Sequence, residues 1–225
     1  LVPVPGDGRY EWDGYLPIIQ KPNMLNPPEG YFATANQNVT PASYEHWNAI
    51  GFSWSDPFRG DRVEEVLGAG KKLNMADRKA LQVDYHSILA SVLVPLLLDL
   101  PLTGKSDEAQ AKLRGWDFNL APNSIEAAIY VAFENKMSTL ASSRFIPASA
   151  KSHIDKIQMK KLVDWLVEPD SRFGPNPSQG RDQFLVDAFN NGLGDLEKTL
   201  GDDINNWQYG QEKFKHTYMA HSLGK

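Results

Sequence analysis

The segment "GYFATANQN", residues 30–38, alternates bulky and small side chains and ends in the polar run Asn36-Gln37-Asn38. Asparagine that only fills a turn usually lies beside glycine or proline. Asn36 instead follows the run Tyr-Phe-Ala-Thr-Ala, whose alternation is typical of a strand. The pattern therefore predicts that Asn36 lies at the end of a strand that leads into a tight site.

Two interpretations of Asn36 and of Arg62 remain open on the residues alone. A carboxamide on a rigid strand end can donate its N–H to a developing oxyanion, an effect of about 2.7–4 kcal/mol; Asn36 could equally bond the backbone of a turn. Arg62 could be a surface cation or a buried guanidinium that fixes a polar network. An arginine in the first turn of a helix opposes the helix dipole, which mildly favours a specific role.

The chain around this segment divides into three parts. Residues 1–62 are rich in Pro, Gly, Asn and aromatic side chains and predict short strands and turns, with a hairpin in "GDGRYEWDGYL" at residues 6–16. Residues 63–205 predict a mostly helical region, and residues 206–225 a mixed return segment. The expected fold class is α+β, with strands and loops before the helices.

Cap signals and apolar spacing place the helices. Asp61 and Glu64 form a cap pair with Gly68 as the stop. Apolar residues at three- and four-residue spacing predict one helix from Asn74 to about residue 96, kinked or ended by Pro95. Asn123 and Glu126 form another cap pair, and further helices are expected over residues 151–167 and 181–200.

Composition excludes several classes of function. The 225 residues include 41% hydrophobic and 23% charged side chains, as in ordinary globular proteins. The net charge of −5 argues against a nucleic-acid partner. The apolar run Val92–Leu98 is too short to cross a membrane and contains a proline, so we expect no membrane partner. Because there is no cysteine, disulfides and thiolate chemistry are excluded; we expect a periplasmic or secreted protein, and a cytoplasmic location stays open.

The common catalytic motifs are absent from the sequence. The five histidines are scattered and form no HExxH pair, and "GAGKK" at residues 68–72 lacks both the first glycine and the Ser or Thr of a phosphate loop. There is no G-x-S-x-G elbow, and the first residue is Leu1 rather than Ser, Thr or Cys. On its residues alone, the chain offers stabilising groups rather than a nucleophile.

Five stretches, taken in order, resemble the penicillin acylase (penicillin amidase) family of N-terminal nucleophile hydrolases. They are "PVPGDGRYEWDGYLP", "NPPEGYFATANQN", "GDRVEEVL", "LRGWDFNLAPNSIEAAIYVAF" and "NNWQYGQEKFKHTYMAHSLG", and together they extend over nearly the whole chain. The resemblance implies a hydrolase that cleaves N-acyl amide bonds of small molecules such as β-lactams or acyl-homoserine lactones. It also implies an αββα sandwich, of which this chain would be an internal fragment of the large subunit.

Roles for two residues follow from the resemblance alone. In the family, the N-terminal serine of the large subunit forms the acyl-enzyme, and the matching oxyanion-hole asparagine here is Asn36. The arginine that supports this network matches Arg62. No cofactor is implied for the chemistry, although the family binds a structural calcium ion whose ligands lie mostly outside this segment.

The nucleophilic serine of the family lies upstream of the matched segment. We therefore expect the chain alone to be inactive and to need the remaining segments of its precursor, besides a small N-acylated substrate. The alternative is a non-catalytic, acidic helical module that binds a ligand or a partner chain.

Overall fold

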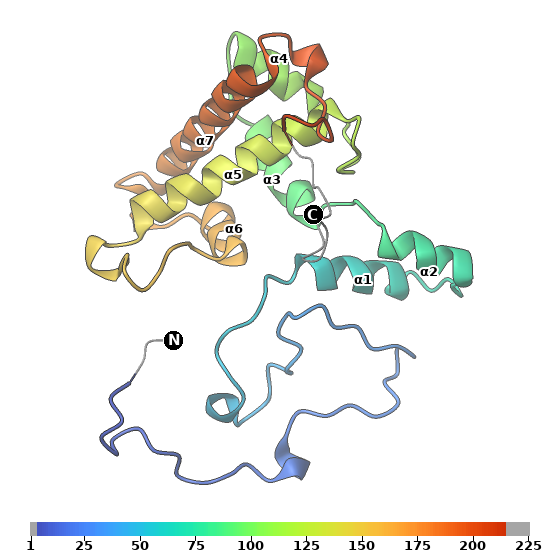
Figure 1. Cartoon of the computed structure of the whole chain (residues 1–225), viewed down its shortest axis with the longest axis vertical. Coiled ribbons are helices and arrows are strands. Elements are labelled where there is room, and N and C mark those ends of the chain that lie inside the picture. The colour runs from blue at the N-terminus through green and yellow to red at the C-terminus, as the bar shows by residue number, and fades with distance from the viewer. Residues whose placement is uncertain (1–3, 215–225) are drawn as a thin grey trace, which may run out of the picture. The chain divides into compact units, whose positions relative to one another are not determined.

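The structure, a computed structural model, describes residues 4–214. The chain forms two compact units, Leu1–Asn74 and Met75–Lys225, and each is described by itself (Figure 1). The boundary falls later than the expected end of the N-terminal segment at Arg62. The roles given to residues 1–62, 63–205 and 206–225 remain predictions, and residues 215–225 of the return segment lie outside the described part.

Helices and loops make up both units. The first unit contains the short 3-10 helices η1 (Ile18–Gln20) and η2 (Trp47–Ala49) and the helix α1 (Phe58–Gly68). The second unit contains α2 (Met75–Gln82), α3 (Ile88–Leu98), α4 (Lys105–Lys112), α5 (Ile125–Phe145), η3 (Ala148–Ala150), α6 (Met159–Val167), η4 (Ser171–Phe173), α7 (Pro177–Leu200) and η5 (Ile204–Asn206).

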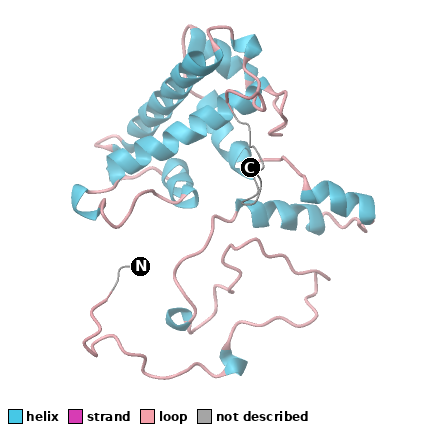
Figure 2. Ribbon diagram, in the orientation of Figure 1, coloured by secondary structure: helices cyan, strands magenta, loops and turns pink. Residues whose placement is uncertain are grey.

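The strands expected before α1 are not present in the described residues of the first unit. Residues 4–57 are loops and single 3-10 turns, so the hairpin at residues 6–16 and the strand at residues 31–35 were wrong predictions (Figure 2). The amide of Ala35 illustrates the reason, because it donates to Oε1 of Gln37 at 2.6 Å rather than to a neighbouring strand. A strand needs a neighbouring strand for its backbone groups, and residues 31–35 have none among the described residues of this unit.

Helix α1 begins one turn earlier than the cap pair predicted. Its first residue is Phe58 and Asp61 lies in its first turn, where a carboxylate interacts favourably with the helix dipole. Asp61 therefore does not act as the N-cap, a position that Pro57 occupies. The predicted stop at Gly68 is confirmed.

The helix predicted from Asn74 to residue 96 is interrupted. The backbone N–H of His86 donates to Oδ1 of Asp84 at 2.8 Å, and Oγ of Ser87 caps α3 by accepting from Ala90. Residues 85–87 also pair with residues 118–120, through an antiparallel bridge between His86 and Asn119. This long-range pairing replaces the helical bonds that would have joined α2 to α3.

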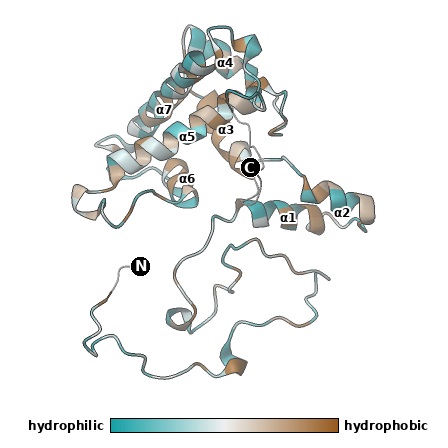
Figure 3. Ribbon diagram, viewed as in Figure 1, coloured by the Kyte–Doolittle hydropathy of each residue, from teal (hydrophilic) through white to brown (hydrophobic). Residues whose placement is uncertain are grey.

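Helix α3 is the most apolar helix of the second unit (Figure 3). Pro95 lies inside it and the helix ends soon afterwards, at Leu98. The side chain of Gln110 on α4 is buried and donates to the backbone oxygens of Leu97 (2.8 Å) and Leu100 (2.9 Å). One buried amide thus donates to two carbonyls at and just beyond the C-terminal end of α3, where the last carbonyls of a helix lack i+4 partners.

The two longest helices carry clear end signals. Ser124, rather than the expected Asn123, caps α5 by accepting from the amide of Ala127. Asn176 caps α7, Pro177 is its first residue and Gly201 follows its last residue with φ of 90°, the common order of proline at the start and glycine at the end. Helix α7 therefore starts earlier than the predicted residue 181, and α6 starts later than the predicted residue 151.

Helices α5 and α7 pack side by side and form the centre of the second unit (Figure 1). Phe133 of α5 and Phe189 of α7 are both fully buried and meet edge to face, with ring centroids 5.7 Å apart and planes at 82°. Gly192 lies where α7 comes closest to the backbone of α5. A Cβ at this position would lie 2.9 Å from both the carbonyl carbon of Ala132 and the nitrogen of Phe133.

Two glycines of α7 provide a matched test of this close approach. Alanine at Gly194 would meet no atom within 4 Å, so Gly194→Ala is expected to raise the free energy of unfolding by about 0.5–1 kcal/mol through helix propensity. Gly192→Ala gains the same helix propensity but forces the helices apart. Its free energy of unfolding is therefore expected to be about 1–3 kcal/mol lower than that of Gly194→Ala. Urea unfolding followed by circular dichroism measures both. Equal stability of the two variants would contradict the close packing at Gly192.

An aromatic cluster lies at the start of α5. Trp116 packs against Phe118 and Tyr130, with ring centroids 5.5 and 5.6 Å away. Tyr130 is fully buried. Burial, reinforced by the negative charge of Glu134, raises the pKa of Tyr130 well above its usual value near 10.

Tyr130→Phe is expected to change the alkaline limb of the stability profile. A raised pKa means that the folded state favours neutral Tyr130, so this contribution is complete below pH 10 and is lost as the pH rises further. Below pH 10 the difference in stability between the variant and the original chain should stay constant, because Tyr130 is then neutral in both the folded and the unfolded state. Above pH 10, Tyr130→Phe should lose less stability than the original chain. Identical profiles for the two proteins in urea titrations between pH 7 and 11 would contradict the prediction.

Candidate active site

Residues 31–37 run antiparallel to α1 within the first unit. The hydroxyl of Tyr31 donates to the backbone oxygen of Glu64 at 3.4 Å, near the C-terminal end of the helix. Gln37 lies at the other end, where its buried side chain covers Gly60. A Cβ on Gly60 would come within 2.2 Å of the end of this side chain, so a larger residue would require the Gln37 carboxamide to move.

The backbone of Asn36 is held in an uncommon conformation. Its φ is 69°, in the left-handed region that asparagine tolerates better than most other residues. Its carbonyl oxygen accepts from the amide of Ser55 at 3.0 Å, and on its N-terminal side the amide of Ala35 donates to Oε1 of Gln37. These bonds fix the direction in which the Asn36 side chain leaves the loop.

An arginine of α1 orients the Asn36 carboxamide. Nη2 of Arg59 donates to Oδ1 of Asn36 at 2.8 Å and to the backbone oxygen of Ala35, also at 2.8 Å. A guanidinium carries donors only, so the carboxamide must direct its oxygen toward Arg59 and its NH2 group elsewhere. Asn36 is exposed, and no hydrogen bond to another residue in the range 4–214 occupies its NH2 group. This donor is therefore available to an external acceptor.

Arg62 is half-buried on the same helix, three residues after Arg59. Its Nη1 lies 2.9 Å from Oε2 of Glu65, and the exposed fractions of the two side chains are 25% and 55%. Residues three apart on a helix are neighbours on its surface. The structure thus places the two predicted site residues, Asn36 and Arg62, in the first unit. Asn36 is bonded to Arg59, and Arg62 is bonded to Glu65.

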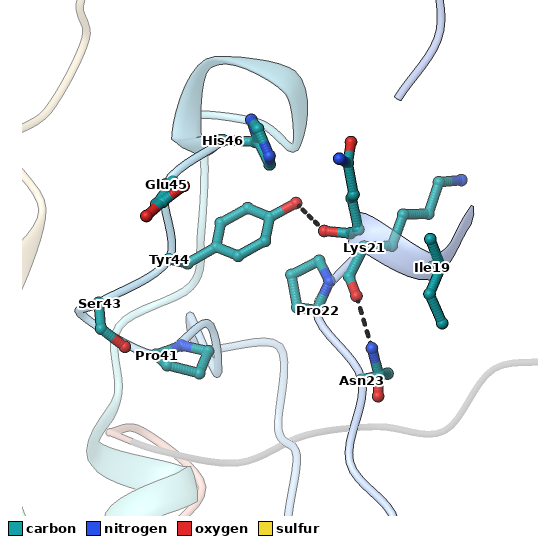
Figure 4. A pocket seen from close by; sticks show the side chains of 10 residues that line it. Ile19, Lys21, Pro22, Asn23, Pro41, Ser43, Tyr44, Glu45 and His46 are labelled. Atoms are coloured by element: carbon teal, nitrogen blue, oxygen red, sulfur yellow. Dashed lines mark hydrogen bonds between the residues drawn. The ribbon is translucent and has the colours of Figure 1, made fainter. Parts of the chain in front are cut away.

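Two adjoining pockets lie in the same unit. One has a volume of about 490 Å³ and is lined by residues 19–23, Pro41 and residues 43–46; the hydroxyl of Tyr44 spans it by donating to the oxygen of Gln20 at 2.8 Å (Figure 4). The other has a volume of about 280 Å³ and includes Phe32 and Val39 in its mostly apolar lining. Asn36 lies between Phe32 and Val39 in the sequence but is not among the residues that line either pocket.

The remaining polar residues form no metal site in the described part. Within residues 4–214, no group of three or more His, Cys, Asp or Glu side chains lies close enough to hold a metal ion. The described residues therefore offer no such carboxylate cage for the calcium ion expected of the parent protein. None of the helices between residues 4 and 214 combines the length and the apolar character needed to cross a bilayer.

Comparison with known proteins identifies the family of this chain. The penicillin amidase family profile matches residues 1–225. An acyl-homoserine lactone acylase QuiP of Pseudomonas fluorescens strain Pf-5 is 28% identical over 246 aligned residues, which cover 97% of this chain and 30% of that protein. The QuiP acylase of strain Pf0-1 is 34% identical over 149 residues, covering 59% of this chain and 18% of that protein.

A third relative is the penicillin acylase 2 proenzyme of Pseudomonas sp. strain SE83, 30% identical over 146 residues that cover 64% of this chain and 19% of that protein. All three relatives are acylases, a kind of hydrolase. The chain belongs to the penicillin amidase family. It spans less than a third of the length of these curated relatives.

Proposed function

We propose that the parent protein of this chain hydrolyses N-acyl amide bonds of small molecules through an N-terminal serine. The serine attacks the amide carbonyl, its own α-amine takes the hydroxyl proton and passes it to the departing amine, and water then releases the acyl group as a carboxylic acid. The supporting observations are the family match over residues 1–225 and the acylase relatives. The names of these relatives indicate two kinds of substrate, acyl-homoserine lactones and penicillins.

In this proposal, Asn36 provides part of the oxyanion hole. Negative charge develops on the carbonyl oxygen only when the tetrahedral intermediate forms, so a donor directed at that point lowers the barrier selectively. The observation that carries the proposal is the Asn36 carboxamide, whose oxygen is bonded to Arg59 while no hydrogen bond to a residue between 4 and 214 occupies its NH2 group. Its left-handed backbone further limits the directions that the side chain can take.

Arg62 is proposed to support this network. Its planar fork and permanent charge suit the positioning of polar groups around the serine and the substrate. Its bond to Glu65 shows that the guanidinium is held on the helix surface in this chain. The nucleophile itself would belong to another segment, so this chain alone is expected to be inactive.

The remaining segments of the precursor are proposed to complete the fold. Several large apolar side chains of the first unit are more than four-fifths exposed; they are Trp12, Tyr15, Ile18, Ile19 and Leu25. Surface of this kind is commonly covered by a partner. We propose that it packs in the αββα sandwich of the parent, where residues 31–35 would gain strand neighbours. A structural calcium ion and a periplasmic or secreted location are proposed for the parent on family grounds.

The proposal is tested on the full-length parent protein. N-terminal sequencing of the mature subunits should find serine at the start of the large subunit, and a sulfonyl fluoride should label that serine. A panel of N-acyl substrates, including acyl-homoserine lactones of graded chain length and acylated β-lactams, should show release of the free amine. Acyl-chain preference would then define the substrate class.

Failure of amide hydrolysis across the panel, by a folded and processed protein, would overturn the proposal. A parent protein no longer than this chain would overturn the fragment interpretation. In either case, the non-catalytic binding module would be the better interpretation of the acidic helical region.

A further inference from the structure

We propose that Arg59 is a positioning residue for the oxyanion hole, because it selects the orientation of the Asn36 carboxamide. The inference rests on the proposed role of Asn36. It assigns to Arg59 a function that the motif resemblance attached only to Arg62.

The geometry shows one nitrogen holding two oxygens that belong to neighbouring residues. Nη2 of Arg59 carries two N–H bonds, and its two acceptors are Oδ1 of Asn36 and the backbone oxygen of Ala35, each at 2.8 Å. The guanidinium therefore locks the Asn36 side chain to the backbone of its own loop. A single hydrogen bond would leave the carboxamide free to swing about this contact.

The helix that carries Arg59 is itself held against the loop. Arg59 lies in the first turn of α1, and the next residue, Gly60, is covered by the buried side chain of Gln37. Gln37 accepts from Ala35 at 2.6 Å, so the same residue contacts both the helix and the loop. Arg59 thus reaches Asn36 from a helix whose first turn already packs against the same loop at Gly60.

A carboxamide needs such a partner because its two ends have similar shapes and opposite hydrogen-bonding character. Rotation by about 180° about χ2 exchanges Oδ1 with Nδ2. In the flipped state, the oxygen of Asn36 would face the developing oxyanion and its NH2 group would face the donors of Arg59. Both contacts are repulsive, so Arg59 excludes this state. Its positive charge also polarises the amide and strengthens the N–H donor on the opposite side.

Lysine at position 59 could not reproduce both hydrogen bonds of Arg59 fully. An ammonium group is a compact donor on a flexible stem, whereas the guanidinium presents paired N–H bonds in a fixed plane. Arg59→Lys is therefore expected to keep the charge but hold the two oxygens less firmly. Its activity should lie between that of the original enzyme and that of Arg59→Met.

The test is a double-mutant cycle in the full-length parent enzyme. Arg59→Met is expected to lower kcat by about 10- to 100-fold with little change in KM, a smaller loss than removal of the donor itself. Asn36→Gly removes the carboxamide and suits the positive φ of this position. In the Asn36→Gly background, Arg59→Met should cause no further loss beyond about twofold, because its target is gone.

Chemical rescue separates positioning from a general structural effect. Methylguanidinium added to Arg59→Ala should restore part of kcat, whereas methylammonium at equal ionic strength should restore less. Arg78→Met removes an exposed arginine from α2 and serves as the matched control, with kcat expected to stay unchanged. Circular dichroism confirms that each variant is folded.

The outcomes distinguish this inference from the proposed function. Equal losses from Arg59→Met in both backgrounds, or unchanged activity in Arg59→Met, would overturn the positioning role alone. Unchanged activity in Asn36→Gly would overturn the oxyanion role of Asn36 and the inference with it. Coupling between the two sites together with rescue by methylguanidinium supports the inference.

Discussion

Asn36→Asp in the full-length parent enzyme is expected to lower kcat by about 10²–10³-fold, equivalent to about 2.7–4 kcal/mol of transition-state stabilisation. The replacement has nearly the same shape, and its carboxylate can still accept from Nη2 of Arg59. It has no donor, however, and it brings a negative charge toward the oxygen that becomes negative during the reaction. Because the lost interaction exists only in the transition state, kcat and kcat/KM should fall together.

Asn38→Asp is the matched control for this substitution. It makes the same change of charge two residues further along, and Oδ1 of Asn38 already accepts from the amide of Thr40 at 2.9 Å. A carboxylate can keep this bond, so kcat is expected to stay within about twofold. Urea unfolding should show that both variants remain folded. An equal loss in the two variants would point to local charge rather than to the donor of Asn36, and unchanged turnover in Asn36→Asp would remove Asn36 from the oxyanion hole.

The second unit shows which helices a sequence can predict. Helices α5 and α7 were expected because both carry long stretches of recurring apolar residues, although the cap residues Ser124 and Asn176 were not predicted. The break between α2 and α3 was missed because apolar spacing continues across it, while its cause is a pairing with residues 118–120 that local patterns do not contain. Helix α4 was missed because its sequence, KSDEAQAK, has helix-forming residues but little apolar periodicity.

The first unit shows why strand patterns are weaker predictors. Alternation in residues 31–35 indicates a backbone suited to a sheet, but hydrogen bonding to a neighbour decides whether a strand forms. Within the described residues of this unit, the segment bonds to a side chain and lies along α1. Its sheet partners are therefore proposed to come from other segments of the parent.

The roles of Asn36 and Arg62 remain predictions, and the sequence supports the choice of residues in the candidate site only in part. Asn36 could be singled out from its place after an alternating run, whereas Arg59 could not be chosen over Arg62 without the start of α1. The argument that an arginine in a first turn opposes the helix dipole was applied to Arg62, because the helix was expected to begin at Asp61. With the helix beginning at Phe58, the same argument selects Arg59, the residue that bonds Asn36.

Phe189→Ala is expected to produce the largest loss of stability in the second unit, about 3–5 kcal/mol. Phe189 is fully buried, and its ring meets the edge of Phe133 at the contact between α5 and α7. Removing the ring leaves a cavity between two helices that cannot collapse freely, because α7 already approaches the backbone of α5 at Gly192. For a unit of this size, the melting temperature should fall by roughly 6–20 °C.

Phe189→Leu and a double-mutant cycle with Phe133→Ala show whether this loss comes from the contact between the helices. Leucine fills part of the cavity, so Phe189→Leu should lose clearly less stability than Phe189→Ala. Phe133→Ala and Phe189→Ala remove the same ring contact, so the double variant should lose less than the sum of the two single losses. Thermal unfolding followed by circular dichroism at 222 nm reports mainly on the helices of the second unit. A loss below about 1 kcal/mol in Phe189→Ala, or full additivity in the double variant, would contradict the packing of α7 on α5 at this pair.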